Sequence, residues 1–367
     1  MKVAVVANDW KKVSTVNNLL NSLFKQVDLI IGDRVITSSH LTYPYKTDFE
    51  MKLGISKDAK ESFLTSGLWY KDSDANPEEL NQIRSEFIAP LPNSSDSDKS
   101  RILDLMGRIH LPLFEQRKLL LGGCTIQLKF IPNDPSFYLM CSNDLRVKSV
   151  EFIDASLYLQ RSRVSKPLME GIHKGLEKSD VKYPLRESFV IPITIGKGII
   201  DTILDNVHNG QLPRRAFVAF VDHNAFNGSY LTNPFNYQNF GLNHLAFYLN
   251  GIQYPEKAFT PDFDNQLYMR EFMSLFESTN QDSTDSCINV DRKSFVKGNN
   301  IFAVNFAPDL SSGCCSTGYA NPIKYGNLRL QLRFKTPLDK PITTLVYLEY
   351  DTILEIDQER KPIYDFN

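Results

Sequence analysis

Two distant stretches of this sequence share one pattern of alternating side chains. Residues 121–131 read LGGCTIQLKFI, and residues 325–335 read YGNLRLQLRFK. In both, a glycine precedes four apolar residues at every second position, with polar or basic residues between them. A period of two is typical of a half-buried β-strand, because successive side chains point to opposite faces. The pattern predicts that the chain builds the same strand twice, with Phe130 and Phe334 at equivalent inward positions.

The repeat extends to the segments that precede each strand. Residues 17–36 predict a short helix and then a hairpin with its turn at Gly32-Asp33. Residues 234–254 predict the same, with the turn at Asn250-Gly251. Asn-Gly between two apolar runs favours a hairpin, because both residues must adopt positive φ.

A predicted helix follows each hairpin. Each helix carries three large apolar residues at i, i+4 and i+8, the spacing of a single helix face. The two trios are Tyr45, Phe49 and Leu53, and Tyr268, Phe272 and Phe276. Helix, hairpin, helix and strand therefore follow in one order in both halves, which indicates an internal duplication of a mostly β domain.

Length and loop composition favour two tandem jelly-roll β-sandwiches. The chain has 367 residues, enough for two cores. Polar loops such as 92–100 and 311–322 separate short predicted strands, as in sandwich folds. A helix is predicted after Asn76-Pro77. We expect a first jelly roll over 1–145 and a second over 146–367, the second opening with the strand in VKSVEFIDASLYLQRSRV.

Composition excludes several classes of protein. Net charge is −2, so no overall field attracts nucleic acid or an anionic membrane. The apolar runs are too short for a membrane span or a signal peptide. We therefore expect synthesis in the cytoplasm and no secretion. The five cysteines indicate reduced thiols.

The sequence predicts no catalytic residue, no cofactor site and no metal site. The six histidines lie outside metal-ligand spacing of one another, and His223 is expected at a strand end or in a loop. Asp282, Asp285 and Asp291 do not match a calcium loop, and Cys314-Cys315 is expected in a surface loop. Arg214-Arg215 is expected on a solvated face or in a subunit contact. The protein is therefore predicted not to be an enzyme.

Seven long segments of the two halves carry a resemblance to a known family: VNNLLNSLFKQVDLIIGDRVI (16–36), TYPYKTDFEMKL (42–53), SGLWYKD (66–72), GRIHLPLFEQRKLLLGG (107–123), GQLPRRAFVAFVDHNAFNGSYLTNPFNYQNFGLNHLAFYLNG (210–251), YMREFMSLFEST (268–279) and GNLRLQLRFKTPLDKPITTLVYLEYDTILEID (326–357). In these segments the chain resembles the double-jelly-roll major capsid proteins of Maverick (Polinton) elements and adintoviruses.

This resemblance implies a structural protein that forms homotrimers. Three chains with two jelly rolls each would give a pseudo-hexameric capsomer that tiles an icosahedral shell. It also implies a minor capsid (penton) partner, a place in the virion, and assembly in either the host cytoplasm or the nucleus. The alternative is a domesticated jelly-roll protein that binds or hydrolyses glycans without capsid assembly.

The start of the sequence departs from the family pattern. Family members usually carry a further upstream segment, and MKVAVVAND resembles only the tail of the first jelly roll's opening strand. We therefore expect the first jelly roll to be incomplete at its N-terminal side and to be the weaker of the two. An exposed strand edge of that kind invites pairing with other chains.

Overall fold

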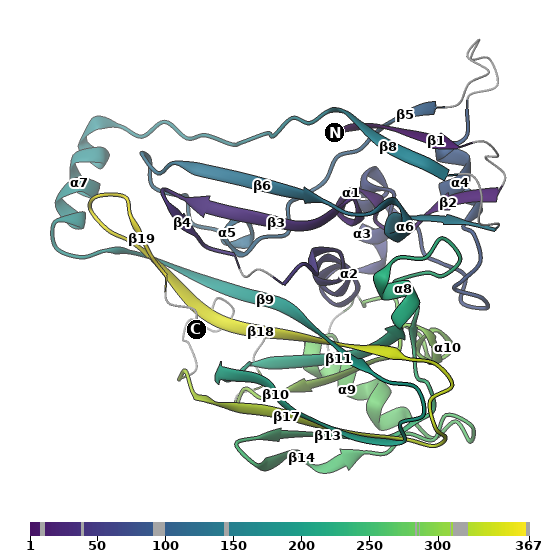
Figure 1. Ribbon diagram of the computed structural model, residues 1–367. Helices are drawn as coiled ribbons and strands as arrows, with labels where there is room; N and C mark the ends of the chain where they lie inside the picture. Colours follow the sequence, from purple (N-terminus) through teal and green to yellow (C-terminus); the bar gives the residue numbers. More distant parts are fainter. Residues whose placement is uncertain are drawn as a thin grey trace.

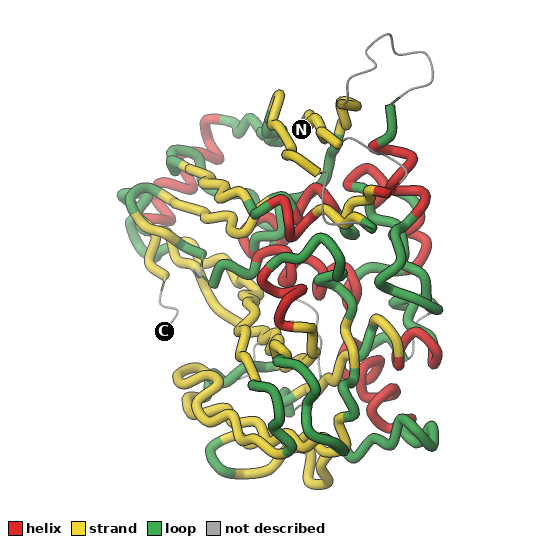
Figure 2. The backbone as a smooth tube through the Cα atoms, turned by 45° about the vertical axis from the view of Figure 1, so that its right-hand side comes forward, coloured by secondary structure: helices red, strands yellow, loops and turns green. Residues whose placement is uncertain are grey.

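The computed structural model is a β-rich chain in which two sets of sheets are stacked around short helices (Figures 1 and 2). Sheets from the first half of the chain lie above those of the second half in Figure 1. The structure describes residues 1–7, 12–37, 40–90, 100–142, 147–282, 285, 287–308, 310 and 322–364.

The second half of the chain forms a complete jelly roll from two facing sheets. One sheet has the strand order β10-β17-β13-β14. The other has the order β16-β11-β18, with β9 on the free side of β18 and β19 at its far end. The strands are β9 (Val181–Ile195), β10 (Asp201–Gln211), β11 (Arg215–Asp222), β13 (Leu242–Leu249), β14 (Ile252–Phe259), β16 (Ile301–Asn305), β17 (Tyr325–Phe334), β18 (Ile342–Ile356) and β19 (Pro362–Tyr364).

The sheet that contains β11 and β18 is buried on both faces. All eight residues of β11 and the first nine of β18 are buried, in place of the alternation of a half-exposed strand. One face packs on the facing sheet through residues such as Phe220 and Phe334. The other face packs through Phe217 and Tyr347 on elements of the first half.

The first half repeats most of this arrangement. Its sheets have the orders β5-β1-β8 and β4-β3-β6, which match β16-β11-β18 and β14-β13-β17 of the second half. Among the described residues, nothing in the first half corresponds to β9 and β10. The strands are β1 (Lys2–Ala7), β3 (Phe24–Ile31), β4 (Arg34–Val35), β5 (Ser100–Asp104), β6 (Ile126–Pro132) and β8 (Val147–Asp154), with two small pairs formed by β2 (Val13–Thr15) with β7 (Leu139–Cys141) and β12 (Tyr237–Gln238) with β15 (Lys297–Gly298).

Strand pairing changes the expected division between the halves. The expected boundary at 145/146 lies outside the described residues. β8, which was expected to open the second jelly roll, instead pairs along β1 of the first. The residues that follow it, 155–164, form no strand, and the second jelly roll opens with β9. By its neighbours β1 takes the place of β11, so it is not the tail of an opening strand as expected.

Helices fill the space between the two halves and cover the sheet ends (Figure 1). The expected apolar faces are present: Tyr45, Phe49 and Leu53 of α2 are buried, and Tyr268 and Phe276 are buried at α9. The helices are α1 (Leu19–Ser22), α2 (Tyr43–Gly54), α3 (Lys57–Glu61), α4 (Gln82–Ile88), α5 (Pro112–Glu115), α6 (Pro135–Tyr138), α7 (Lys166–Leu176), α8 (His223–Asn227), α9 (Met269–Thr279) and α10 (Arg292–Val296), with a 3₁₀ turn at Phe63–Gly67.

Two predicted helices are absent. Residues 234–240, expected to match α1, form turns and the short strand β12. After Asn76-Pro77 the chain makes one turn, with the Glu79 amide donating to the Asn76 carbonyl at 3.1 Å. That turn does not continue as a helix. The Glu78 carboxylate accepts from the Asn233 backbone amide and from the Asn236 side-chain amide, and the next helix, α4, begins only at Gln82.

Both hairpins form with the predicted two-residue turns. Asn250 and Gly251 have φ of 52° and 81°, as the turn requires. The matched phenylalanines differ, however. Phe334 is 1% exposed, whereas Phe130 is 41% exposed. Phe334 lies in a sandwich that β9 and β10 complete, and Phe130 lies where no described strand covers it.

Candidate functional site

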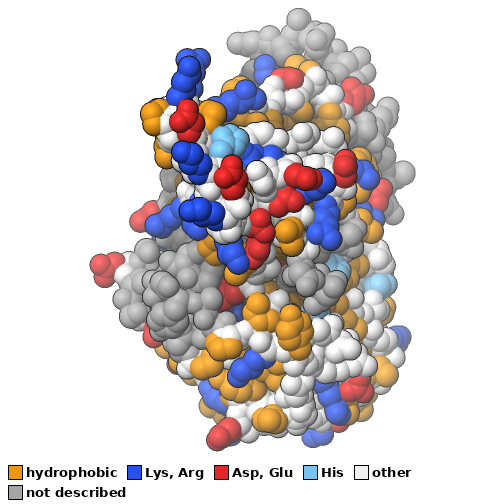
Figure 3. Space-filling view, turned by 90° about the vertical axis from the view of Figure 1, so that its left-hand side faces the viewer, with side chains coloured by type: hydrophobic (Ala, Val, Ile, Leu, Met, Phe, Trp, Pro, Cys, Tyr) orange, Lys and Arg blue, Asp and Glu red, His pale blue; other side chains and the backbone are white. Residues whose placement is uncertain are grey.

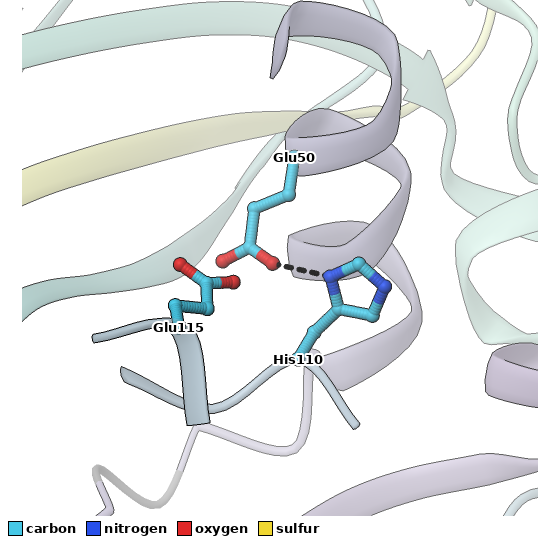
Figure 4. A group of neighbouring side chains, drawn as sticks. All are labelled: Glu50, His110 and Glu115. Carbon is cyan, nitrogen blue, oxygen red and sulfur yellow. Dashed lines mark hydrogen bonds and ion pairs between the residues drawn. The ribbon is translucent and has the colours of Figure 1, made fainter. Parts of the chain in front are cut away.

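Three side chains with potential metal-ligand atoms converge between α2 and the segment that leads into α5 (Figure 4). Glu50 lies on α2 and Glu115 is the last residue of α5. His110 lies in the segment that leads into α5. One ligand atom from each lies within 4.8 Å of the other two. Nδ1 of His110 is 2.9 Å from Oε2 of Glu50.

The local sequence fixes two of these residues in place. Ten of the twelve residues of α2 are buried, so the helix is packed on nearly all sides and holds the half-buried Glu50 within these contacts. On the other side, Leu111 and Leu113 are buried and anchor the segment that carries His110. The backbone amide of His110 also donates to the Tyr43 hydroxyl at 3.2 Å.

The two oxygens of Glu50 have different partners. Oε1 accepts a hydrogen bond from the Ser188 hydroxyl at 2.9 Å and lies 3.9 Å from Nζ of Lys46. Oε2 faces His110. Burial opposes ionisation of Glu50, but Lys46 and the hydrogen bonds from His110 and Ser188 outweigh it, so its pKa is held below the ordinary value.

The pKa of Glu115 is shifted in the opposite direction to that of Glu50. Within the described part of the chain, its carboxylate makes no hydrogen bond or ion pair. The residue is exposed as a whole, but its carboxyl group lies in a crowded environment. Desolvation there and the facing Glu50 carboxylate raise the pKa of Glu115 to about 7. Such a pair of carboxylates with an imidazole can share a proton or hold a cation.

The structure places the other residues considered from sequence in structural roles. His223 is the first residue of α8, directly after β11, and both its ring nitrogens have hydrogen-bond partners, Thr343 and Asn227. The Asp291 carboxylate caps α10 by accepting from two backbone amides. Asp282 and Asp285 form no ligand group with it among the described residues. Cys314-Cys315 lies outside the described residues.

The expectation for Arg214-Arg215 is wrong. Both side chains are buried, at 8% and 5% exposure. Arg214 forms an ion pair with Asp351 at 2.8 Å, and Arg215 forms one with Glu349 at 2.5 Å. The pair of arginines therefore belongs to the interior of the buried sheet and not to a solvated face.

A second feature is a long exposed segment that joins the two halves. Residues 151–171 are all exposed, and they run from β8 to α7 across the top of the molecule in Figure 1. Several of the exposed side chains are apolar: Phe152, Ile153, Leu157, Tyr158, Leu159, Val164, Leu168 and Met169. Figure 3 faces the end of the molecule that carries α7, where acidic and basic side chains are interspersed.

Three phenylalanines lie at the open side of the first half. The ring of Phe24 is 4.9 Å from that of Phe130 and 5.8 Å from that of Phe152, measured between centroids. These rings come from both sheets of the first half, yet Phe130 and Phe152 are 41% and 46% exposed. The core of the first half is therefore partly open to solvent in this chain.

The fold defines a class, the double jelly roll, which the chain shares with viral capsid proteins. Over 100% of its length it is similar to a chain of the PBCV-1 virus capsid (TM-score 0.54, 10% identity, 88% of that chain). It is also similar over 100% of its length to a chain of the Sputnik virophage (0.55, 12%, 80% of that chain). The Faustovirus major capsid protein matches 94% of this chain (0.51, 8%, 74% of that protein).

Sequence comparison finds a more similar protein outside the viruses. "Uncharacterized protein F54H12.2" of Caenorhabditis elegans is 26% identical over 370 residues, covering 98% of this chain and 84% of that protein. No protein-family model matches the chain. Across the described residues, no helix combines the length and the apolar character that a membrane crossing requires.

Proposed function

We propose that this protein is the major capsid subunit of a virus-like shell, encoded by a Maverick (Polinton) type transposable element. The observation that carries the proposal is the double jelly roll in one chain, similar over its full length to capsid chains. The sequence resemblance stated above supports the Maverick assignment.

The geometry suits a trimeric capsomer. Three chains would contribute six jelly rolls and give a pseudo-hexameric outline, which packs evenly against neighbouring capsomers. The exposed apolar segment 151–171 is a surface that such contacts would cover, because contiguous exposed apolar surface marks interaction sites. We place the division between the jelly rolls after Asp154, since β8 completes the first-half sheet.

The proposal also covers the partner protein and the location of the subunit. A minor capsid (penton) protein would close the vertices, and the subunit would be made in the host cytoplasm and reside in the virion. The chain would act as a building element and not as an enzyme, and it would have no direct sequence-specific contact with nucleic acid.

Electron microscopy of the purified protein tests this function. Negatively stained particles should show three-fold objects with a near-hexagonal outline, alone or in curved arrays. Single two-lobed particles at every protein concentration would contradict it. A soluble glycan-binding or hydrolytic role would be favoured if such single particles bound an oligosaccharide array.

A further inference from the structure

The Glu50–His110–Glu115 cluster brings two carboxylates to an imidazole. Glu115 makes no hydrogen bond or ion pair in the described part of the chain, although its carboxylate points toward that of Glu50 (Figure 4). Two ionised carboxylates at this separation repel each other. A bound positive ion would remove the repulsion.

The ligand chemistry favours an ion of the zinc type. Imidazole nitrogen and carboxylate oxygen are both zinc ligands, with bonds of roughly 2.0–2.2 Å. Magnesium and calcium prefer sites made only of oxygen. The three ligand atoms lie within 4.8 Å of one another. Glu115 makes no hydrogen bond or ion pair among the described residues, so no such interaction has to break when its carboxylate binds an ion.

Neighbouring side chains orient the Glu50 carboxylate in the way that outer residues orient a metal-binding carboxylate. Oε1 is held by the Ser188 hydroxyl at 2.9 Å, and Lys46 lies on that same side of the carboxylate. Oε2 is left directed at His110. Hydrogen bonds of this kind orient metal-binding carboxylates from outside the coordination sphere.

We propose that Glu50, His110 and Glu115 bind one divalent transition-metal ion of the zinc type. The ion would join α2 to the segment that ends in α5. Through Ser188 of β9, it would also tie both to the first strand of the second jelly roll. The site is thus a cross-link between the two halves of the chain, independent of any assembled shell.

Calorimetric titration of the 367-residue chain with zinc chloride, after treatment with EDTA, tests the proposal at a pH above 7. We expect one zinc ion per chain and a higher melting temperature with zinc. Magnesium chloride should give neither effect. X-ray absorption should show nitrogen and oxygen neighbours without sulfur, which separates this site from cysteine binding.

Variants identify the ligands. Glu115→Gln and His110→Gln should each lower zinc affinity by more than about 100-fold, and Ser188→Ala by roughly 10- to 100-fold. Glu177→Gln and His173→Gln, two exposed residues at α7, are the matched controls and should bind as the wild type does. Circular dichroism checks that each variant is folded.

The proposal is overturned if the folded wild type takes up no zinc, or if Glu115→Gln binds zinc as tightly as the wild type. Sulfur neighbours in the absorption spectrum would overturn it as well. A cluster that only shares a proton would show a pH-dependent melting temperature that zinc leaves unchanged.

Discussion

Two adjacent residues of β17 show how strongly the alternating pattern separates interior from surface. Leu332 is fully buried in the second core, whereas the Arg333 side chain is 51% exposed beside Asp201. We expect Leu332→Asp to lower the free energy of unfolding by about 3–5 kcal/mol, because it buries an unpaired charge. Urea denaturation followed by circular dichroism measures the change.

Arg333→Ala is the control for that substitution. Its ion pair with Asp201 is exposed, so its loss should cost no more than about 1 kcal/mol. Equal effects of the two substitutions would contradict the assignment of Leu332 to the core.

The buried Arg215–Glu349 pair gives a second prediction. The guanidinium also donates to the Ser278 carbonyl at 2.9 Å, so both charges are fully compensated inside the sheet. Arg215→Met should cost about 3–5 kcal/mol, because it removes the ion-pair partner of the buried Glu349 carboxylate. Among the described residues, that carboxylate then keeps only the Tyr347 hydroxyl and the nearby charge of Arg186. The double variant Arg215→Met/Glu349→Gln should recover most of that loss in thermal and urea denaturation. A double variant as unstable as the single one would show that the loss comes from packing and not from the charge.

The pH dependence of stability should carry a contribution from Glu115. Its pKa of about 7 in the folded state lies above the ordinary value of 4.5. Between these values the folded state binds more protons than the unfolded state, so the stability contribution is present at low pH and is lost as the pH rises through 7.

With EDTA present, Glu115→Gln should flatten this part of the pH profile and raise the melting temperature above pH 7. Thermal unfolding across the pH range is the measurement. Glu177→Gln should leave the slope as in the wild type. A Glu115→Gln profile as steep as that of the wild type would contradict the account.

At the scale of elements, the sequence pattern predicted correctly those features that depend on interactions between residues close together in the chain. The Asn250-Gly251 turn and the buried faces of α2 and α9 follow from backbone and spacing rules that act over a few residues. Residues 76–79 carry a good helix start, but they form a single turn in which Glu78 contacts Asn233 and Asn236, far away in sequence. Tertiary contacts of this kind leave no local signal.

The candidate site was missed for the same reason. Glu50 and His110 are sixty residues apart, and only the packing of α2 against the α5 segment brings them together. The sequence showed the five-residue spacing of His110 and Glu115 but gave no reason to pair them with α2. Arg214 and Arg215 were misassigned because their acidic partners lie on β18, more than a hundred residues away.

The open strand edges of the first half predict uneven local stability. Among the described residues β8 pairs only with β1 and β6 only with β3, whereas β18 and β17 have neighbours on both sides. Amides on the open side of β8 and β6 should exchange with solvent much faster than their counterparts in β18 and β17. Hydrogen exchange with mass spectrometry measures this directly.

Limited proteolysis supplies an independent check. The first half should be cut before the second, because fewer strand contacts hold it. If β8 and β6 are protected as well as β18 and β17, and the first half resists digestion equally, then the open edges have no effect on stability.

At the scale of the whole molecule, the two jelly rolls are not independent units, because they share contacts along β9 and β18. β9 and β18 are each fifteen residues long, and their Tyr183 and Ile356 ends pack with the hairpin of the first half. The remainder of both strands belongs to the second jelly roll. One long buried sheet therefore sets the orientation of the two jelly rolls.

The mass of the protein in solution tests the central proposal most directly. Light scattering coupled to size exclusion, over a series of protein concentrations, should give a species of three times the 41.9 kDa chain mass. Leu157→Ser/Leu159→Ser, in the exposed segment, should shift that species toward the monomer, while Arg333→Ala should not. A wild-type protein that stays at 41.9 kDa at the highest concentration would contradict the proposal of a capsomer-forming subunit.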